Sequence, residues 1–340
     1  MELDIEEFDA LRLYLARYAG RGAPVSFKKL VGGVSNRVVQ VTWADGRGWV
    51  LKQALSKLRV AVEWFSSPER ILVEAKGLRW LNRLAPSGTT PSFIFEDPAN
   101  HLIAMEAIPE DHENWKSVLL SGQIVPDHFE QFGFLLGSIH RKSVEVGREV
   151  CAAFADTSYF ESLRLEPYYL YTAERIPEAS SFLRALSEET RCHKLCLVHG
   201  DFSPKNALLY RSKLVLLDYE VVHYGDPAFD VGFALTHFLS KANHMTKNRA
   251  RLTAAAGRFW RAYFNEIAPL GWDGIEPRMV RHTLGCLLAR VAGKSPLEYL
   301  TAEESARQRS VTLPLMANPP DKVGDLIGAF SEKIEAHAKN

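Results

Sequence analysis

The sequence predicts an α+β fold with two lobes, a small β-sheet lobe at the N-terminus and a larger, mostly helical lobe after it. Up to about Pro109, short β-branched or alternating runs are separated by glycine-bearing turns, which is typical of strands. From about Glu110 the apolar residues recur every three or four positions, which indicates helices. A chain of 340 residues can form two domains, and we place them at residues 1–109 and 110–340.

Composition narrows the class of protein. Hydrophobic residues make up 46% and charged residues 24%, as in soluble globular proteins, and the formal net charge is +0. This balance gives no support to a nucleic-acid or membrane partner, and no apolar run approaches the ~20 residues of a membrane span. The N-terminal stretch is acidic and amphipathic, unlike a signal peptide. We therefore expect a cytoplasmic location.

The cysteines are few and widely spaced. Cys192 and Cys196 flank a strand entry, and with His193 they form a conceivable metal site. Buried free thiols in a reducing compartment are the preferred interpretation for all four, which are Cys151, Cys192, Cys196 and Cys286.

The N-terminal part begins with a helix over residues 4–18, followed by a first strand at 24–30 and a glycine-bearing turn into a second strand that ends at Trp43. Such a turn lets backbone N–H groups approach phosphates, although a plain hairpin turn has the same pattern. The candidate phosphate-binding residues in it are Gly32, Gly33, Ser35 and Asn36. The Val-Leu run before Lys52 predicts a third strand, and residues 70–78 with Glu74 predict a helix.

A hairpin is predicted around residues 96–100, after which Glu106 to Pro109 leave the sheet. A helix is predicted from His128 to His140–Arg141, because helices often end on cations. Further helices are predicted at residues 229–239, 280–291 and 323–337, with no repeats or heptads and no pattern that sets an oligomeric state.

The stretch from Cys196 to Asp230 organises the rest of the chain. Its first strand ends at His199-Gly200-Asp201, and an apolar hairpin then ends at Asp218. Two turns of the chain therefore bring Asp201, Asn206 and Asp218 to one end of a small sheet, with Glu220 two residues on. All of them could instead be turn caps, a common use of Asp and Asn.

Phosphoryl transfer needs this set of side chains. A carboxylate such as Asp201 accepts the proton of the attacking hydroxyl, while the oxygens of Asn206 and Asp218 suit Mg²⁺ on the nucleotide phosphates. Glu220 is a further candidate for metal or substrate. Asp230, near the next helix start, is expected to hold the loop by hydrogen bonds rather than touch substrate.

The motif His-Gly-Asp, with Asn five residues later and Asp218 after an apolar run, resembles the catalytic loop and metal-binding aspartate of protein kinases. His-Gly-Asp rather than His-Arg-Asp is similar to the aminoglycoside phosphotransferase and choline kinase superfamily. Within it, Lys52-Gln53-Ala54-Leu55 followed by Arg59, the Asp218-Tyr219-Glu220 triplet and Leu165-Glu166-Pro167-Tyr168 resemble methylthioribose kinases.

The resemblance implies a bilobal protein kinase-like fold. It also implies that Lys52 contacts the ATP phosphates and pairs with Glu74, and that the backbone of Glu106 and Ile108 binds adenine. Tyr168 and Arg290 become candidate substrate residues. Methylthioribose kinases carry an adjacent arginine pair where this chain has Ala289-Arg290-Val291.

We therefore expect an ATP- and Mg²⁺-dependent phosphotransferase that acts on a hydroxyl of a small metabolite, with a sugar such as methylthioribose as first choice. An aminoglycoside or a small amino alcohol is the alternative. A non-catalytic nucleotide-binding module is the third reading, and it is the weakest because no expected catalytic group is missing.

Overall fold

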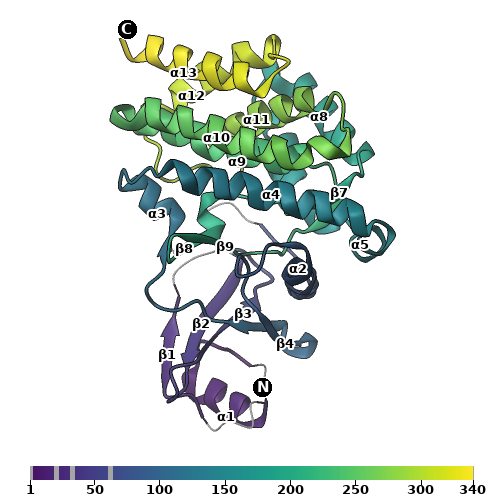
Figure 1. Ribbon diagram of the computed structural model, residues 1–340, viewed down its shortest axis with the longest axis vertical. Coiled ribbons are helices and arrows are strands. Elements are labelled where there is room, and N and C mark those ends of the chain that lie inside the picture. The colour runs from purple at the N-terminus through teal and green to yellow at the C-terminus, as the bar shows by residue number, and fades with distance from the viewer. Residues whose placement is uncertain (1–2, 19–22, 31–34, 60–63, 340) are drawn as a thin grey trace.

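The computed structural model describes residues 3–18, 23–30, 35–59 and 64–339. It has an antiparallel sheet in its N-terminal part and is mostly helical after it, so the predicted fold class is confirmed (Figure 1). The two termini lie at opposite ends of the molecule, the N-terminus beside the sheet and the C-terminus beyond the last helices.

The N-terminal sheet has five strands in the order β1-β2-β3-β5-β4, and every neighbouring pair is antiparallel. Two longer helices accompany it, α1 (Phe8–Tyr18) and α2 (Arg70–Leu84). The strands are β1 (Ser26–Lys29), β2 (Asn36–Thr42), β3 (Gly48–Ala54), β4 (Phe93–Asp97) and β5 (Leu102–Glu106).

The side chains of β5 point alternately to the two faces of this sheet, and each face packs against a helix. Leu102 and Ala104 belong to a cluster with α1, whereas Ile103 and Met105 belong to the cluster that contains the buried side of α2. Successive side chains of a strand point to opposite faces, so one strand can hold a helix on each side. Lys52 on β3 pairs with Ile103, which directs it to the face covered by α2.

The C-terminal part consists of helices with two small sheets, β10-β7 and β6-β8-β9. Its strands are β6 (Glu113–Asn114), β7 (Cys196–Val198), β8 (Ala207–Tyr210), β9 (Lys213–Leu216) and β10 (His223–Gly225). Its helices are α3 (Trp115–Leu120), α4 (Pro126–Val146), α5 (Arg148–Ala153), α6 (Ser158–Phe160), a π-helix (Glu161–Leu170), α7 (Tyr171–Arg175), α8 (Ser180–Cys192), α9 (Ala228–His244), α10 (Arg249–Ile267), α11 (Ile275–Ala292), α12 (Ala302–Ala317) and α13 (Val323–Lys339).

The end of α4 differs from the sequence prediction. The helix continues past His140–Arg141 to Val146, and Arg141 pairs with Glu145 one turn later at 2.7 Å. A cation followed by a carboxylate four residues on belongs to a helix interior as readily as to its end. Gly147, with φ 68°, ends the helix instead.

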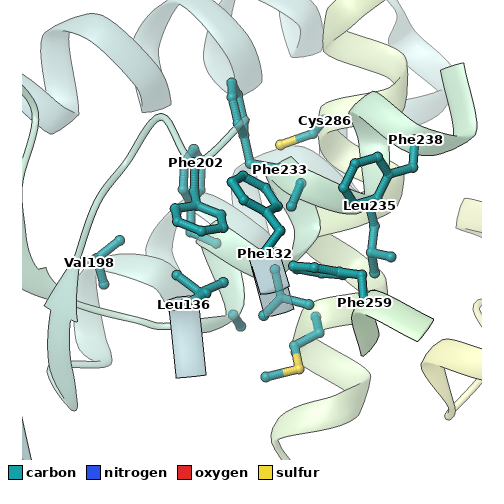
Figure 2. Packing of buried hydrophobic residues seen from close by; sticks show 14 of the residues in the cluster. Phe132, Leu136, Val198, Phe202, Phe233, Leu235, Phe238, Phe259 and Cys286 are labelled. Atoms are coloured by element: carbon teal, nitrogen blue, oxygen red, sulfur yellow. The ribbon is translucent and has the colours of Figure 1, made fainter. Parts of the chain in front are cut away.

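The helical core positions the loop after β7. Phe202, directly after Asp201, stacks on Phe132 of α4 with ring centroids 3.9 Å apart, and Phe238 and Phe259 pack behind them (Figure 2). Helix α10 can approach α4 because position 133 is glycine, where a Cβ atom would lie 2.2 Å from the Phe259 carbonyl oxygen. The loop is therefore anchored by packing as well as by hydrogen bonds.

The cysteine prediction is right for Cys196 and Cys286, which are buried free thiols, and wrong for Cys151 and Cys192, which are exposed. His193 lies against the Glu189 carbonyl oxygen at 2.8 Å. The group of side chains that could hold a metal within the described ranges contains no cysteine. Among those same residues no helix combines the length and the apolar character needed to cross a bilayer.

Candidate active site

The loop after β7 is held by a buried carboxylate. Asp230 on α9 accepts the backbone N–H of His199 at 2.7 Å and that of Gly200 at 2.8 Å, one on each oxygen. Burial opposes its ionisation, but the contact with His140 and the His199 amide lower the pKa of Asp230 below its ordinary value. The predicted hydrogen-bonding role of Asp230 is confirmed.

Gly200 is the position of this loop that only glycine can occupy. Its φ is 77°, in the left-handed region, and a Cβ atom there would lie 2.9 Å from both the carbonyl oxygen and a methyl carbon of Val221. The loop and the segment after Asp218 therefore touch backbone to backbone.

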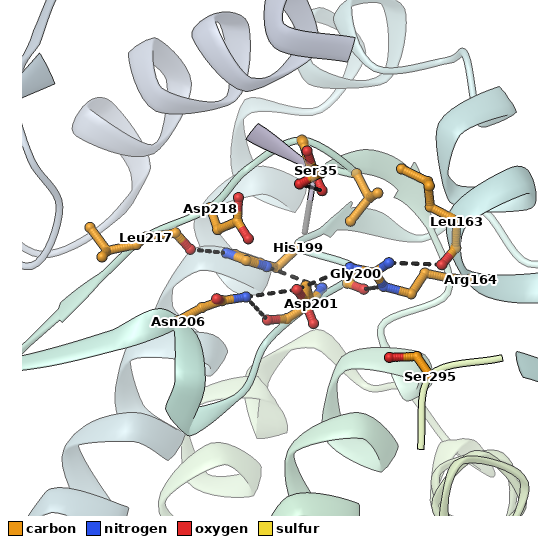
Figure 3. A network of polar contacts seen from close by, with 12 residues as sticks. Ser35, Leu163, Arg164, His199, Gly200, Asp201, Asn206, Leu217, Asp218 and Ser295 are labelled. Carbon is orange, nitrogen blue, oxygen red and sulfur yellow. Dashed lines mark hydrogen bonds and ion pairs between the residues drawn. The ribbon is translucent and has the colours of Figure 1, made fainter. Parts of the chain in front are cut away.

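His199 joins the two loops that carry the candidate carboxylates. Its Nδ1 accepts the N–H of Asp201 at 3.2 Å, so Nε2 carries the proton and donates to the Leu217 carbonyl oxygen at 3.2 Å. Burial lowers the pKa of His199, which favours this neutral form. The Leu217 N–H also bonds to the Asn206 carbonyl oxygen at 2.9 Å. Together these contacts bring Asp201, Asn206 and Asp218 around one imidazole (Figure 3).

One oxygen of Asp201 contacts both an amide group and a guanidinium group. Asn206 Nδ2 donates to Asp201 Oδ2 at 2.8 Å, and Arg164 Nη2 lies 3.0 Å from the same atom (Figure 3). Arg164 is buried on the π-helix, and its Nε donates to the Gly200 carbonyl oxygen at 2.7 Å. Since Asn206 uses its nitrogen here, its amide oxygen is the atom left for a cation.

Asp218 faces the small lobe, where Lys52 lies between two carboxylates. Lys52 Nζ is 2.7 Å from Asp218 Oδ1 and 2.5 Å from Glu74 Oε1, so the pairing of Lys52 with Glu74 has the geometry that the sequence predicts. Burial raises the pKa of Glu74 to about 7 against the attraction of Lys52. Asp218 is half-buried, and although burial opposes its ionisation, Lys52 lowers the pKa of Asp218 well below its usual range.

Glu220 is bound by donors from the small lobe. Its two oxygens accept the Ser35 hydroxyl at 3.0 Å, the Asn36 amide at 3.3 Å and Arg70 Nε at 3.1 Å. Arg70 is fully buried on α2 and also donates to the carbonyl oxygens of Ser35 and Leu55. This hub holds the end of the glycine-bearing turn, the end of β3 and the segment after Asp218 together.

The donor set fits a hard divalent cation. Glu74, Asp218 and Glu220 each offer an oxygen, and these atoms lie within 4.8 Å of one another. Glu74 Oε2 is buried without a hydrogen-bond partner among the described residues. Carboxylate oxygens at such spacing suit Mg²⁺, with the Asn206 amide oxygen on the adjoining loop. Lys52 and Arg70 supply the positive charge there in the structure.

The strand β5 leads into the segment expected to bind adenine. The Glu106 N–H is bonded to the Ser92 carbonyl oxygen and the Ala107 N–H to that of Gly48, both at 2.9 Å. The half-buried Ile108 has no acceptor for its N–H within the part of the chain that the structure describes. Gly32 and Gly33 lie outside the described residues.

Tyr168 and Arg290 contact each other on the helical side of the site. Arg290 Nη1 donates to the Tyr168 hydroxyl at 2.8 Å, and the Arg164 guanidinium lies 5.9 Å from the Tyr168 ring. Sequence reasoning missed Arg70 and Arg164. Arg70 stands one turn before Glu74 on the same helix face, which was a usable signal, whereas nothing in the sequence marks Arg164.

The sequence is similar to those of known phosphotransferases. A family model described as "Phosphotransferase enzyme family" matches residues 26–277, which is most of the chain. A methylthioribose kinase of Cronobacter sakazakii is 26% identical over 255 residues. That match covers 66% of this chain and 63% of the relative, so the chain spans less than two thirds of the relative's length.

Solved structures show the same fold. An amicoumacin kinase in complex with AMP-PNP, Ca²⁺ and its antibiotic aligns with a TM-score of 0.60 at 15% identity, covering 94% of this chain and 96% of that one. A macrolide 2'-phosphotransferase from Brachybacterium faecium aligns with a TM-score of 0.57 at 19% identity, over 92% and 99% of the two chains. At these identities the likeness concerns the fold.

Proposed function

The chain belongs to the phosphotransferase enzyme family, and on that premise we propose that it transfers the γ-phosphoryl group of ATP to a hydroxyl of a small-molecule alcohol. The observation that carries the proposal is the joining of Asp201 and Asp218 through His199, next to Lys52 on the opposite lobe. Phosphoryl transfer needs a proton acceptor and a phosphate site side by side, and little else from the protein.

Each residue then has a defined task. The acceptor hydroxyl oxygen forms the new bond to the γ-phosphorus, the bond to the bridging oxygen breaks, and ADP leaves with the electron pair. The hydroxyl proton passes to Asp201. Lys52, oriented by Glu74, holds the ATP phosphates. We assign phosphate binding also to Ser35 and Asn36, and to Gly32 and Gly33, which lie outside the described residues.

Asp218 and Asn206 would hold Mg²⁺, with Glu220 as a third oxygen donor that Arg70 keeps in place. The ion, when bound, neutralises charge on the phosphate oxygens. The backbone carbonyl of Glu106 suits the adenine amino group, and the N–H of Ile108, which has no acceptor among the described residues, suits a ring nitrogen on the same edge. All of these assignments depend on the contacts given above.

The acceptor is a sugar-like alcohol in our first choice, methylthioribose being the substrate named for the relatives. An aminoglycoside or a small amino alcohol is the second choice. A nucleotide-binding module without catalysis is the third, and it disagrees with a complete set of Lys52, Glu74, Asp201, Asn206 and Asp218.

The test is ATP consumption over a panel of sugars, amino alcohols and aminoglycosides. With an accepted alcohol, Asp201→Ala should lower the rate by ~10²–10⁴-fold while ATP·Mg²⁺ still raises the melting temperature. Equal turnover by the variant and the parent would refute the role of Asp201. Absence of any stabilisation by ATP·Mg²⁺ would refute the proposal as a whole.

A further inference from the structure

Two buried cations beside the candidate site lack a counter-ion. Lys241 on α9 is fully buried, and Arg290 on α11 is 8% exposed. Within the described residues neither forms an ion pair with a carboxylate. Arg290 Nη1 bonds only to neutral oxygens, those of Tyr168 and Ser295, and Lys241 makes one long contact of 3.4 Å to the His237 carbonyl oxygen. Burial without a counter-ion costs a charged group several kcal/mol or makes it lose its proton more easily, so a bound anion would stabilise the charged forms of both side chains.

Lys241 belongs to a line of side chains on one face of α9, here called the stripe, which begins near Asp201, the proposed proton acceptor. Phe233, His237 and Lys241 follow one another at intervals of four along α9, which places them on one helix face. At one end the Arg164 guanidinium, paired with Asp201, lies 6.0 Å from the Phe233 ring. At the other end Lys241 Nζ lies 5.2 Å from the Tyr299 ring.

Several donors along this stripe are buried and unused. The atoms Arg290 Nε, His237 Nε2 and the Tyr299 hydroxyl have no hydrogen-bond partner among the described residues. Within the described chain every side-chain hydrogen bond of Arg290 is made by Nη1, so its Nε–Nη2 edge has no partner there. That edge binds carboxylates and phosphates through two parallel hydrogen bonds.

The pKa shifts of the side chains along the stripe are consistent with the lack of a counter-charge. Burial, with repulsion from Lys116 and Arg290, lowers the pKa of Lys241 to about 7 although Glu298 opposes the shift. Burial and the same cations lower the pKa of His237 well below its usual range. The carboxylates nearby are already engaged, Glu298 with Lys116 and Glu304 with His244.

We propose that the acceptor alcohol carries an oxyanion, a carboxylate or a phosphate ester, which binds the unpaired edge of Arg290 with Lys241 and His237 while its hydroxyl meets Asp201. The hydroxyl half of this inference rests on the proposed function, and the oxyanion half on the buried cations alone. An oxyanion would supply the missing counter-charge, so among sugar-like acceptors this inference favours an acid or a phosphate ester over neutral methylthioribose, and it disfavours a polycationic aminoglycoside.

The test compares alcohols that differ only in the charged group: gluconate with glucitol, glycerate with glycerol, and glucose 6-phosphate with glucose. We expect kcat/KM to favour the anionic member of at least one pair by tenfold or more, and the pair identifies carboxylate or phosphate. Arg290→Gln should lower kcat/KM for that member by about 10- to 100-fold, the range for one charge-assisted hydrogen bond. Arg258→Gln, an exposed arginine on α10, is the matched control.

Lys241→Met distinguishes binding from folding. Replacing a buried amino group that has no counter-ion by an apolar chain of similar length should raise the melting temperature, yet it should lower kcat/KM for the anionic acceptor. A lysine with a purely structural role would not show both effects. Neutral members that equal or exceed their anionic partners would overturn the inference while the proposed function stands.

If no alcohol in the panel is phosphorylated, binding of the anions alone still tests the oxyanion site. Stabilisation of the parent protein by gluconate, glycerate or inorganic phosphate, lost in Arg290→Gln, would support the oxyanion site although the proposed function had failed. No stabilisation by any of these anions, together with no turnover, would overturn the inference.

Discussion

The guanidinium of Arg164 and the carboxylate of Asp201 form a largely buried ion pair, with Nη2 3.0 Å from Oδ2. Asn206 donates to the same oxygen. The other oxygen, Oδ1, is therefore the one that can receive a proton from an incoming hydroxyl. Arg164 is thus a positioning residue, because it fixes which face of the carboxylate meets the acceptor.

Removing this pair should affect turnover more than nucleotide binding. We expect Arg164→Met to lower kcat by roughly 10–100-fold, because Asp201 would be held by Asn206 alone. The KM for ATP should change little, since Arg164 contacts no residue of the small lobe in the described chain. Steady-state kinetics measure both, with the exposed Arg175→Met as control. A raised KM for ATP with unchanged kcat would contradict the positioning role.

The metal requirement should depend on Asp218. We expect ATP to raise the melting temperature of the parent protein only when Mg²⁺ is present, and chelation to remove the effect. In Asp218→Asn the Mg²⁺-dependent part should largely disappear, because the amide lacks the charge that a hard cation needs. Asp111→Asn, at an exposed position, is the control. Full Mg²⁺-dependent stabilisation of Asp218→Asn would place the ion elsewhere.

The buried pair of Arg70 and Glu220 should behave as a coupled unit. Arg70→Met leaves a buried carboxylate unpaired and should lower the free energy of unfolding by about 3–5 kcal/mol. The double variant Arg70→Met/Glu220→Gln should lose less than the sum of the single losses. Urea unfolding of all four proteins measures the coupling. Additive losses would mean that the 3.1 Å contact contributes nothing of its own.

Acid should destabilise the fold through His223. Burial lowers the pKa of His223 from 6.5 to about 4, while its ring stacks on Phe160 at 3.9 Å. Between those pH values the unfolded chain binds a proton that the folded chain refuses, so stability is full above pH 6.5 and falls as the pH falls towards 4. The loss amounts to about 3 kcal/mol.

Urea unfolding at pH 7.5 and pH 5 tests this prediction. His223→Asn, which retains a donor for the Val221 carbonyl oxygen, should show a smaller loss on acidification than the parent protein. His337→Asn, at an exposed position of α13, should resemble the parent. An unchanged acid loss in His223→Asn would assign the effect to other groups.

The fold could be predicted from the sequence because its local patterns are consistent. The β-branched runs before Pro109 became the sheet β1–β5, and the three- and four-residue periodicity became helices. The end of α4 was missed because Arg141 bonds forward to Glu145 rather than capping carbonyl groups. Exposure of Cys151 and Cys192 depends on which helix faces pack, and one sequence does not state this.

The part of the candidate site that could be predicted from the sequence is the part whose residues lie in one short stretch of the chain. Asp201, Asn206 and Asp218 lie within 18 residues, and a hairpin brings them together. Arg164 reaches Asp201 from the π-helix, and His237 and Lys241 follow further along α9, so only tertiary packing brings these side chains towards the site. The sequence analysis singled out neither His237 nor Lys241, because one sequence does not show which side chains face them.

Position 200 has a consequence for anyone who exchanges catalytic loops between families. A protein kinase loop with arginine at this place would drive its first side-chain carbon into the backbone of Val221 and would need the left-handed conformation that arginine avoids. Grafting that loop alone should therefore produce a misfolded chimaera. The tripeptide His199-Gly200-Asp201 and the Asp218–Val221 segment have to be transplanted together, as one unit of design.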